Sequence, residues 1–249
     1  MSARFSRQTS LIDADHQVAL RGATVAVAGL GVGAAVVQQA ALLGVGGLRF
    51  CDGDALAVHN LNRHPLGTGS SIGCAKTEVV ARYCLDLDPE LRLEVVGPLD
   101  AARGCGDFVR GASVVVDEVD DVDAKWALRS AAEWHGVPLL MATDLGDGVL
   151  LDCERYDLDV DTLPFHGLTA PTLPVPEQLS RLFGAYCGER FWAAVSKRGP
   201  HDPFPQLGAT VALAGAVTAV AVREIVGGHG FPTGRYLYRL GVAGAEVVE

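Results

Sequence analysis

The chain has 249 residues, a length that suits one large α/β domain or two small ones. Hydrophobic residues make up 49% and charged residues 20%, so the chain can bury a core and is not a disordered protein. The 20 basic and 30 acidic residues give a net charge of −10, which disfavours binding to DNA or to an anionic membrane surface.

The N-terminus and the cysteines favour a cytoplasmic protein. The N-terminus is polar, and the longest apolar run, 209–222, ends at Arg223, short of the roughly 20 residues of a membrane span. The six cysteines form no CxxC pair, so neither a disulfide framework nor a structural zinc site is expected. We therefore expect reduced thiols, no membrane segment and a cytoplasmic location.

The first 144 residues alternate between short apolar segments and segments with helical spacing. The expected strands are 24–29, 47–54, 91–97, 112–121 and 137–144, and the expected helices are 34–44, 74–87 and 123–136. This alternation predicts a doubly wound, mostly parallel sheet with helices on both faces, which is the Rossmann-like α/β class.

The rest of the chain has a different pattern. After residue 145 we expect a strand at an antiparallel edge, a crossover loop over 159–176, a helix over 175–199 that Gly184 or Gly188 can break, a helix over 207–228 and a last strand over 235–240. No linker interrupts the sequence. We therefore expect residues 1–249 to form one domain with antiparallel C-terminal additions, in which about 155–205 is the variable part.

A glycine-rich turn and a carboxylate indicate an adenine nucleotide. Gly29, Gly31 and Gly33 lie between the first strand and the first helix, where a phosphate can approach the backbone at a helix N-terminus. Asp52 ends the second strand, where a carboxylate can bind a ribose hydroxyl. A plain strand-to-helix turn and a turn aspartate are the alternatives, and NAD and ATP both remain open.

Basic residues after Asp52 favour ATP. Arg63 and Lys76 follow Asp52 within 24 residues, and Lys76 is one of only three lysines in the chain. A triphosphate needs such cations because charge moves onto its leaving oxygens, whereas a dinucleotide oxidoreductase does not need them here. A surface arginine and a solvated helix start are the alternative interpretations.

The acidic stretch 117–121 ends the fourth expected strand. Ligand sites of parallel sheets lie at the carboxyl ends of the strands, so these carboxylates can reach a phosphate-bound Mg²⁺. The alternative is a helix cap, for which Asp121 is suitably placed.

Together these motifs resemble the ThiF/MoeB superfamily, which includes the ubiquitin-activating enzymes. The resemblance rests on RFSRQ at 4–8, the glycine turn, the run from Asp52 through NLNR at 60–63, Lys76 and DEVDD at 117–121, all in the order typical of the family. The apolar segment 208–228 also resembles the family's last long helix.

The resemblance implies Mg·ATP-dependent adenylation of a carboxylate, usually the C-terminus of a ubiquitin-like or sulfur-carrier protein. Gly29, Gly31 and Gly33 would line the nucleotide loop, Asp52 would hold the ribose, Asn60, Arg63 and Lys76 would contact the phosphates, and Asp120 would position Mg²⁺ beside Asp121. Arg7 matches the arginine that reaches into the partner subunit's site, which implies a homodimer.

The sequence departs from the family pattern at several positions. The glycine turn is one residue short, Asp121 replaces an Asn, and His64-Pro65 follows Arg63 where the family has a Gln. The paired CxxC motifs of some members are absent. Cys187 is the candidate for a thiol that accepts the acyl group or sulfur, with a buried structural thiol as the alternative.

Two rival functions remain. An NAD-dependent oxidoreductase would use the glycine turn and Asp52 but leaves Arg63, Lys76 and Asp120 without a role. A non-catalytic module of the same fold would only hold a partner. The acyl substrate itself stays open among sulfur carriers, a dedicated peptide and a tRNA-bound carboxylate.

Overall fold

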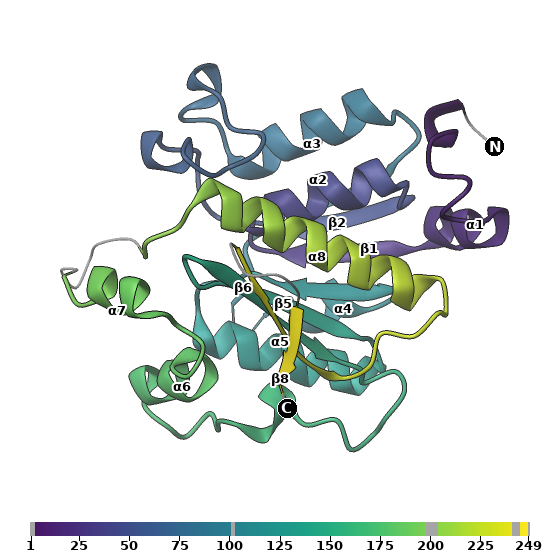
Figure 1. Cartoon of the computed structure of the whole chain (residues 1–249). Coiled ribbons are helices and arrows are strands. Elements are labelled where there is room, and N and C mark those ends of the chain that lie inside the picture. Colours follow the sequence, from purple (N-terminus) through teal and green to yellow (C-terminus); the bar gives the residue numbers. More distant parts are fainter. Residues whose placement is uncertain (1–2, 101–102, 198–203, 241–244, 249) are drawn as a thin grey trace.

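The computed structural model describes residues 3–100, 103–197, 204–240 and 245–248. An eight-stranded sheet crosses the molecule in the order β3-β2-β1-β4-β5-β6-β7-β8 (Figure 1). The strands are β1 Thr24–Ala28, β2 Gly47–Cys51, β3 Arg92–Val96, β4 Val114–Asp117, β5 Leu139–Asp144, β6 Gly148–Glu154, β7 Gly234–Arg239 and β8 Ala245–Val248. The pairs from β3 to β5 are parallel and those from β5 to β8 are antiparallel, which confirms the predicted fold class.

Helices cover both faces of the sheet. One face carries α1 Ala14–Gly22, α2 Gly33–Leu43, α3 Lys76–Leu87 and α8 Gly208–Val226; the other carries α4 Cys105–Val109 and α5 Val122–His135. The side chains of β1 alternate accordingly: Val25 and Val27 pack toward α2 and α8, whereas Ala26 and Ala28 pack toward α4 and α5. Two hydrophobic cores therefore enclose the parallel strands.

The carboxyl ends of β1 and β4 lie side by side, and the chain turns to opposite faces of the sheet after them. After β1 it enters α2, and after β4 it enters α5. This is the topological switch point, where open α/β sheets bind their ligands.

Helix α2 ends at its C-cap residue, Gly44. Gly44 has φ +97°, and a Cβ at this position would lie 2.6 Å from the Gln17 side chain and 2.8 Å from the Phe5 ring. Only glycine fits this left-handed and crowded position. The C-terminal end of α2 is thereby joined to the N-terminal segment of the chain.

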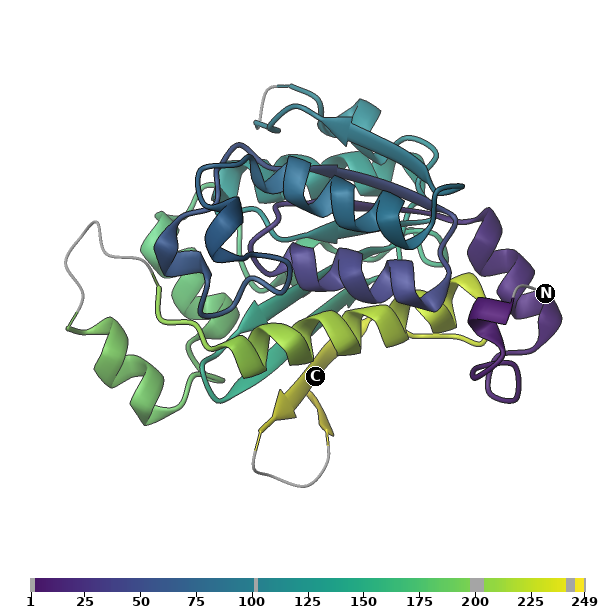
Figure 2. The ribbon, with the colours of Figure 1, turned by 90° about the horizontal axis from the view of Figure 1, so that it is seen from above.

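Helix α8 lies beside α2 over most of its length (Figure 2). It begins and ends close to the predicted 207–228 and is long and apolar enough to span a membrane by length and composition. Half of that apolar window is buried against the rest of the fold, including α2, β5 and β6, as in the core helix of a globular domain.

Two predictions for the C-terminal half need correction, and a third is confirmed. β6 is not an edge strand, because β7 pairs with its other side. The strand at 234–239 is not the last, because β8 adds to it. The segment 175–199 is broken between α6 Val175–Phe183 and α7 Glu189–Val195, in the Gly184–Gly188 region where a break was anticipated.

Short 3-10 turns complete the described structure at Ala3–Phe5, Val58–Asn60, Gly69–Ser71 and Pro164–Gly167. The last of these lies inside the predicted crossover loop. The turn Val58–Asn60 follows β2 and contains the first residue of the NLNR motif, so it forms part of the candidate site.

Candidate nucleotide site

The glycine turn connects β1 to α2 at the switch point. Gly29 has φ +89°, and a Cβ there would lie 2.3 Å from the carbonyl oxygen of Glu118 at the end of β4. A Cβ on Gly33 would lie 2.8 Å from Cγ1 of Val27, whereas Gly31 faces open space. Gly29 and Gly33 are therefore required by close packing, and Gly31 leaves the backbone accessible to a ligand. Among the residues that the structure describes, no side chain caps the N-terminus of α2.

Asp52 joins this turn to the end of β2. Its Oδ2 accepts the Leu30 N–H at 2.7 Å, and its Oδ1 accepts the Asp54 N–H at 2.7 Å. The side chain is 8% exposed. Asp52 therefore holds the glycine turn in place and keeps lone pairs available for further donors.

Lys76 begins α3 but is buried, so the solvated helix start considered for it is wrong. Its Nζ lies 2.7 Å from Oδ2 of Asp54 and 3.4 Å from Oδ1 of Asp52. Asp54 is exposed, and a phosphate can compete with it for the ammonium group. The structure thus brings Lys76 to the same carboxylate that supports the glycine turn.

The NLNR turn places Arg63 at the mouth of this site. Asn60 is buried, and its Oδ1 accepts the Ala57 N–H at 2.9 Å, so this side chain shapes the turn. Arg63 is half-buried, and its Nη1 donates to the His59 carbonyl at 2.7 Å and to Oδ1 of Asn62 at 3.0 Å. Burial lowers the pKa of Arg63, and the charges of Asp144 and Asp120 oppose this shift. Arg63 therefore lies within electrostatic reach of carboxylates that follow β4 and end β5.

Asp144 is a site residue that the sequence reasoning missed. It ends β5, where its Oδ1 accepts the Gly146 N–H at 2.7 Å and its Oδ2 accepts the Thr210 hydroxyl at 2.9 Å. Burial raises its pKa, and Arg63 is among the groups that oppose the shift. A carboxylate at the end of a predicted parallel strand was the available signal, since the same rule had singled out 117–121.

The acidic stretch 117–121 divides into residues with different environments. Asp117 is fully buried and pairs with Arg129 at 2.6 Å and with Lys125 at 3.2 Å. Glu118 accepts the Ala142 N–H at 2.9 Å, and burial raises its pKa to about 8. Asp121 caps α5 by accepting the Ala124 N–H at 2.7 Å. Asp120 is exposed, three residues after the end of β4, and lies within electrostatic reach of Arg63.

Asp120 is the exposed carboxylate that the sequence pattern predicts as a magnesium ligand. Within the described ranges no group of three or more His, Cys, Asp or Glu is placed to hold a metal. Mg²⁺ commonly binds through one or two carboxylates together with substrate phosphates, so a single exposed carboxylate beside a phosphate turn suits an ion that arrives with the nucleotide.

Arg7 lies at the opposite end of α2 from the glycine turn. Its neighbours hold that end: Arg4 donates to the Ala41 carbonyl, and Nε2 of Gln8 donates to the Leu43 carbonyl at 3.0 Å. With 11 residues, α2 is about 16 Å long. Arg7 is exposed and forms no hydrogen bond or ion pair within the described part of the chain. The structure does not bring it to its own chain's site.

Cys187 follows α6 and packs beside Leu145, Leu150 and Leu237. Burial raises the pKa of its thiol. A nucleophilic cysteine needs a lowered pKa, so this environment resembles that of a structural thiol.

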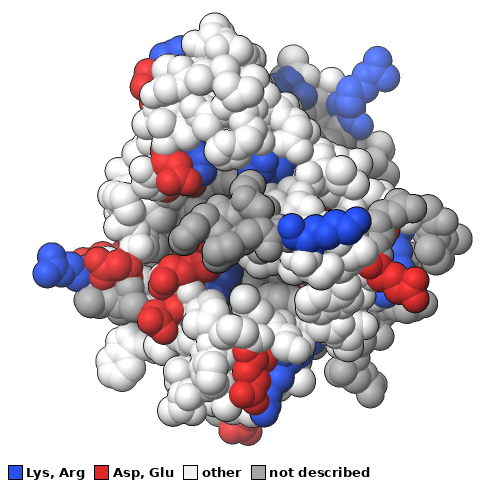
Figure 3. Space-filling model, turned by 90° about the vertical axis from the view of Figure 1, so that its left-hand side faces the viewer, with Lys and Arg blue, Asp and Glu red and all other residues white. Residues whose placement is uncertain are grey.

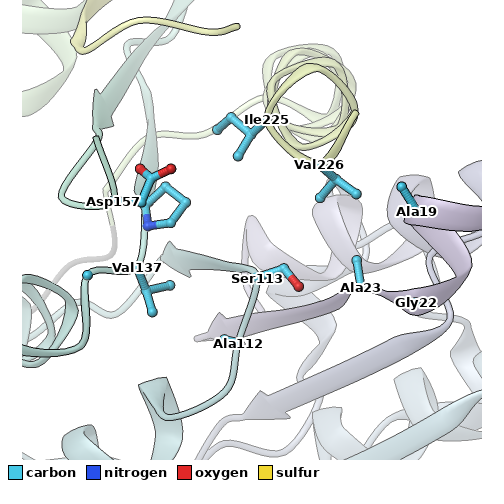
Figure 4. Close-up of a pocket in the computed structure, with 11 residues that line it drawn as sticks. Ala19, Gly22, Ala23, Ala112, Ser113, Val137, Asp157, Ile225 and Val226 are labelled. Carbon is cyan, nitrogen blue, oxygen red and sulfur yellow. The ribbon is translucent and has the colours of Figure 1, made fainter. Parts of the chain in front are cut away.

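Two hollows are prominent in the described structure. One, with a volume of about 390 Å³, lies at the amino ends of the strands between Ala23, Ser113, Val137 and Val226, far from the glycine turn (Figure 4). The other, of about 280 Å³, borders Arg63 and the N-termini of α2 and α8. Figure 3 looks onto the side of the molecule where the parallel strands end, and both basic and acidic side chains lie on this face.

Comparison with known families identifies the class of protein. The model of the ThiF family matches residues 5–155, more than half of the chain. This chain belongs to the ThiF family.

Three curated relatives give more detail. The chain is 40% identical over 168 residues to the uncharacterized protein MT1398 of Mycobacterium tuberculosis, covering 67% of this chain and 23% of that protein. It is 28% identical over 232 residues to the adenylyltransferase and sulfurtransferase MOCS3 of Drosophila willistoni, covering 92% of this chain and 46% of that protein. It is 31% identical over 140 residues to the molybdopterin-synthase adenylyltransferase of Salmonella typhimurium, covering 55% of this chain and 56% of that protein. The chain thus spans about half or less of the length of these three relatives.

Solved structures share the fold. PaaA superposes with a TM-score of 0.75 at 20% identity, covering 100% of this chain and 84% of that one. Escherichia coli MccB in complex with MccA-N7isoASN superposes with a TM-score of 0.71 at 18% identity, covering 100% and 72%.

Proposed function

We propose that this protein is a Mg·ATP-dependent adenylyltransferase that activates a carboxylate as an acyl-adenylate. The observation that carries the proposal is the meeting of the glycine turn, Asp52, Lys76, Arg63 and Asp120 at one end of the parallel sheet. Membership of the ThiF family and the adenylyltransferase names of its relatives support it.

In the proposed reaction a carboxylate oxygen of the substrate attacks the α-phosphorus of ATP. The bond from that phosphorus to the bridging oxygen of pyrophosphate breaks, and pyrophosphate leaves with the bonding electrons. A carboxylate is already ionised at neutral pH, so the step needs no general base. Lys76 and Arg63 stabilise the charge that develops on the leaving phosphates, and Asp52 orients the ribose. Asp120 would hold Mg²⁺, which shields the phosphate charges when bound.

The substrate that we propose is the C-terminus of a ubiquitin-like or sulfur-carrier protein, or of a peptide. Among the relatives are a molybdopterin-synthase adenylyltransferase and a SAMP-activating enzyme E1, and MccB was solved with the peptide-derived MccA. The net charge of −10 disfavours nucleic acid as the partner. The six cysteines are free thiols, which suits a cytoplasmic enzyme.

A homodimer with shared sites accounts for the position of Arg7. Arg7 lies beside the end of α2 that is remote from its own glycine turn, and α2 is about 16 Å long, so we expect Arg7 to serve a phosphate site in a partner subunit. The exposed stripe Ala209, Ala212, Ala216 and Val220 of α8 has no charged residue, and Leu42 of α2 is exposed nearby. Such an uncharged face can pack on a copy of itself around a two-fold axis.

The primary test compares ATP with NAD. We expect ATP with Mg²⁺ to raise the melting temperature of the protein and NAD to leave it unchanged, because ligands that bind the folded state stabilise it. Stabilisation by NAD alone would favour the oxidoreductase. Binding of ATP without any substrate-dependent pyrophosphate exchange, across carrier-protein and peptide C-termini, would favour the non-catalytic module.

The test of the shared site mixes two inactive variants. Arg7→Ala and Asp120→Ala subunits should regenerate one intact site per heterodimer, and so about half of the wild-type activity per heterodimer. Subunit exchange is confirmed separately by pull-down of differently tagged chains. If exchange is complete and no activity returns, Arg7 does not complete the partner's site.

A further inference from the structure

Asp144 ends β5 at the carboxyl end of the sheet, and donors from the fold itself engage its carboxylate. Its Oδ1 accepts the Gly146 N–H at 2.7 Å, and its Oδ2 accepts the Thr210 hydroxyl at 2.9 Å. The Leu207 N–H also bonds to the carboxylate. Because both oxygens already have donors, we expect Asp144 to influence a ligand through its neighbours rather than by contact.

The carboxylate of Asp144 joins β5 to the start of α8. The N-cap residue of this helix is Leu207, whose side chain accepts no hydrogen bond. Asp144 supplies an anionic acceptor there from a distant part of the chain, where the helix dipole favours a negative charge. Thr210 is fully buried, and its hydroxyl lies 2.9 Å from the Leu207 carbonyl oxygen as well. The first turn of α8 is thereby fixed to the end of β5.

The start of α8 in turn contacts the NLNR turn. Nδ2 of Asn62 donates to the Gln206 carbonyl at 3.1 Å, and a Cβ on Gly208 would lie 2.7 Å from the Asn62 carbonyl oxygen. Oδ1 of the same Asn62 accepts a hydrogen bond from Nη1 of Arg63 at 3.0 Å. A continuous path of contacts therefore leads from Asp144 through the start of α8 and Asn62 to Arg63.

The charge of Asp144 also acts on Arg63 through space. Burial lowers the pKa of Arg63, and the charge of Asp144 is the larger of the two that oppose this shift. The hydrogen bonds that Arg63 donates within its own turn both use Nη1, and its Nε and Nη2 donate none to other residues of the described structure. Asp144 thus favours the charged guanidinium group and leaves these N–H groups available to phosphate oxygens.

We propose that Asp144 is a positioning residue, which holds the NLNR turn and the charge of Arg63 in the arrangement that stabilises the leaving pyrophosphate. The inference rests on the proposed adenylyltransferase function and adds to it a residue that touches neither nucleotide nor acyl substrate. A charge that is already in place stabilises a transition state more than one that must reorient during the reaction. The effect of Asp144 should therefore fall on kcat.

Asp144→Asn tests the role of the charge. The amide oxygen can still accept the Gly146 N–H, and the amide N–H can donate to Thr210, whose hydroxyl then donates to the Leu207 carbonyl. We expect a folded variant in which kcat for pyrophosphate exchange falls about tenfold and KM for ATP changes by less than about threefold. As the matched control, Asp147→Asn removes a charge from an exposed position of the same β5–β6 turn and should leave kcat within about twofold.

A double-mutant cycle separates positioning from a merely structural role. In an Arg63→Ala background, whose residual exchange is followed with labelled pyrophosphate, Asp144→Asn should cost less than about twofold, because no guanidinium group remains to be positioned. An equal loss in both backgrounds would overturn the inference, as would wild-type kcat in Asp144→Asn. Thr210→Val, which removes the hydroxyl between Asp144 and α8, should lower kcat about threefold, and Thr210→Ser should restore it.

Hydrogen exchange of the ligand-free protein tests the same role without activity. Amides of residues 58–64 should exchange faster in Asp144→Asn than in wild type or in Asp147→Asn, because the NLNR turn loses part of its support. Unchanged exchange of these amides would overturn the positioning role. Absence of pyrophosphate exchange in wild type with every carrier-protein and peptide C-terminus would instead overturn the proposed function.

Discussion

Asp117 and Asp120 are three residues apart, yet they belong to two different kinds of charged cluster. Asp117 lies in a buried network in which Arg129, with no exposed surface, joins it to Glu154 at distances of 2.6 and 2.9 Å. Arg129 also stacks on Phe165, 3.6 Å from the ring centroid. Asp120 is exposed at the carboxyl end of β4, beside groups whose partners a ligand can replace.

The difference shows how to separate structure from function among charges. The charges of the buried network pair with one another inside the fold, so removing one member would leave another buried charge poorly compensated. The charged residues of the candidate site have partners that a ligand can replace. Lys76 pairs with the exposed Asp54, and Arg63 donates a hydrogen bond to the His59 carbonyl in its own turn. We expect the first cluster to control unfolding and the second to control binding and catalysis.

The largest effect should come from breaking the buried network. Arg129→Ala leaves Glu154 buried without its cationic partner and Asp117 with Lys125 alone, and should lower the free energy of unfolding by about 3–5 kcal/mol. Asp120→Ala, the control outside the network, should change it by less than about 0.5 kcal/mol. Both free energies are obtained from urea denaturation. Comparable losses in the two variants would show that the clusters do not differ in this way.

The converse effect concerns the activity of the loosely engaged charges. Lys76→Ala should lower pyrophosphate exchange with the correct substrate by roughly 10²–10³-fold, as the loss of one group that stabilises developing charge does. A matched change at the exposed Lys197 should leave the exchange rate unaltered. An exchange rate in Lys76→Ala equal to wild type would remove this lysine from the proposed machinery.

A smaller effect links the site to pH. The pKa of His64 is lowered from 6.5 to about 4, so the unfolded chain binds a proton between these values while the folded protein does not. This contribution to stability is complete above pH 6.5 and is lost as the pH falls toward 4, by at most about 1.4 kcal/mol per pH unit. The difference in unfolding free energy between wild type and His64→Leu should therefore change with this sign from pH 7 to pH 4.5. A difference that stays constant over this range contradicts a neutral, buried His64.

The smallest expected effect comes from Asp121, the aspartate of the stretch 117–121 that caps a helix. Asp121 caps α5, and Asp121→Ala should cost about 1 kcal/mol in unfolding free energy with little change in exchange activity. Asp121→Asn, which keeps a capping oxygen, should restore most of that stability. A large loss of activity in both variants would assign Asp121 to the nucleotide instead.

Sequence patterns predicted the parallel half of the fold well, and the reason is visible in particular segments. β1 and β4 are continuous β-branched or small apolar runs, and Gly44 ends α2 at a position that only glycine tolerates. The C-terminal strands were harder, because β7 pairs with β6 across about 80 residues and β8 lies beyond it. Local pattern carries no information about such pairing.

The glycines and the motif spacing made part of the candidate site predictable from the sequence. The roles of residues that depend on how deeply each side chain is buried were not predictable. The glycine turn and Asp52 lie together as expected. The separation of Asp117 from Asp120 depends on Arg129, which approaches from α5, and the environment of Asp144 depends on Thr210, which is 66 residues away in the chain. The spacing of residues along one strand end does not reveal these distant partners.

The attachment of the N-terminal segment to the far end of α2 has a practical consequence for protein engineering. A purification tag or fluorescent fusion placed ahead of Ala3 begins at the end of the molecule that is remote from the chain's own glycine turn. In a two-fold assembly of the proposed kind, the same fusion would lie close to the nucleotide of the neighbouring subunit. A tag at this terminus that slows the enzyme would then act on the other protomer, and its removal by a protease becomes a simple reporter of how the subunits are arranged.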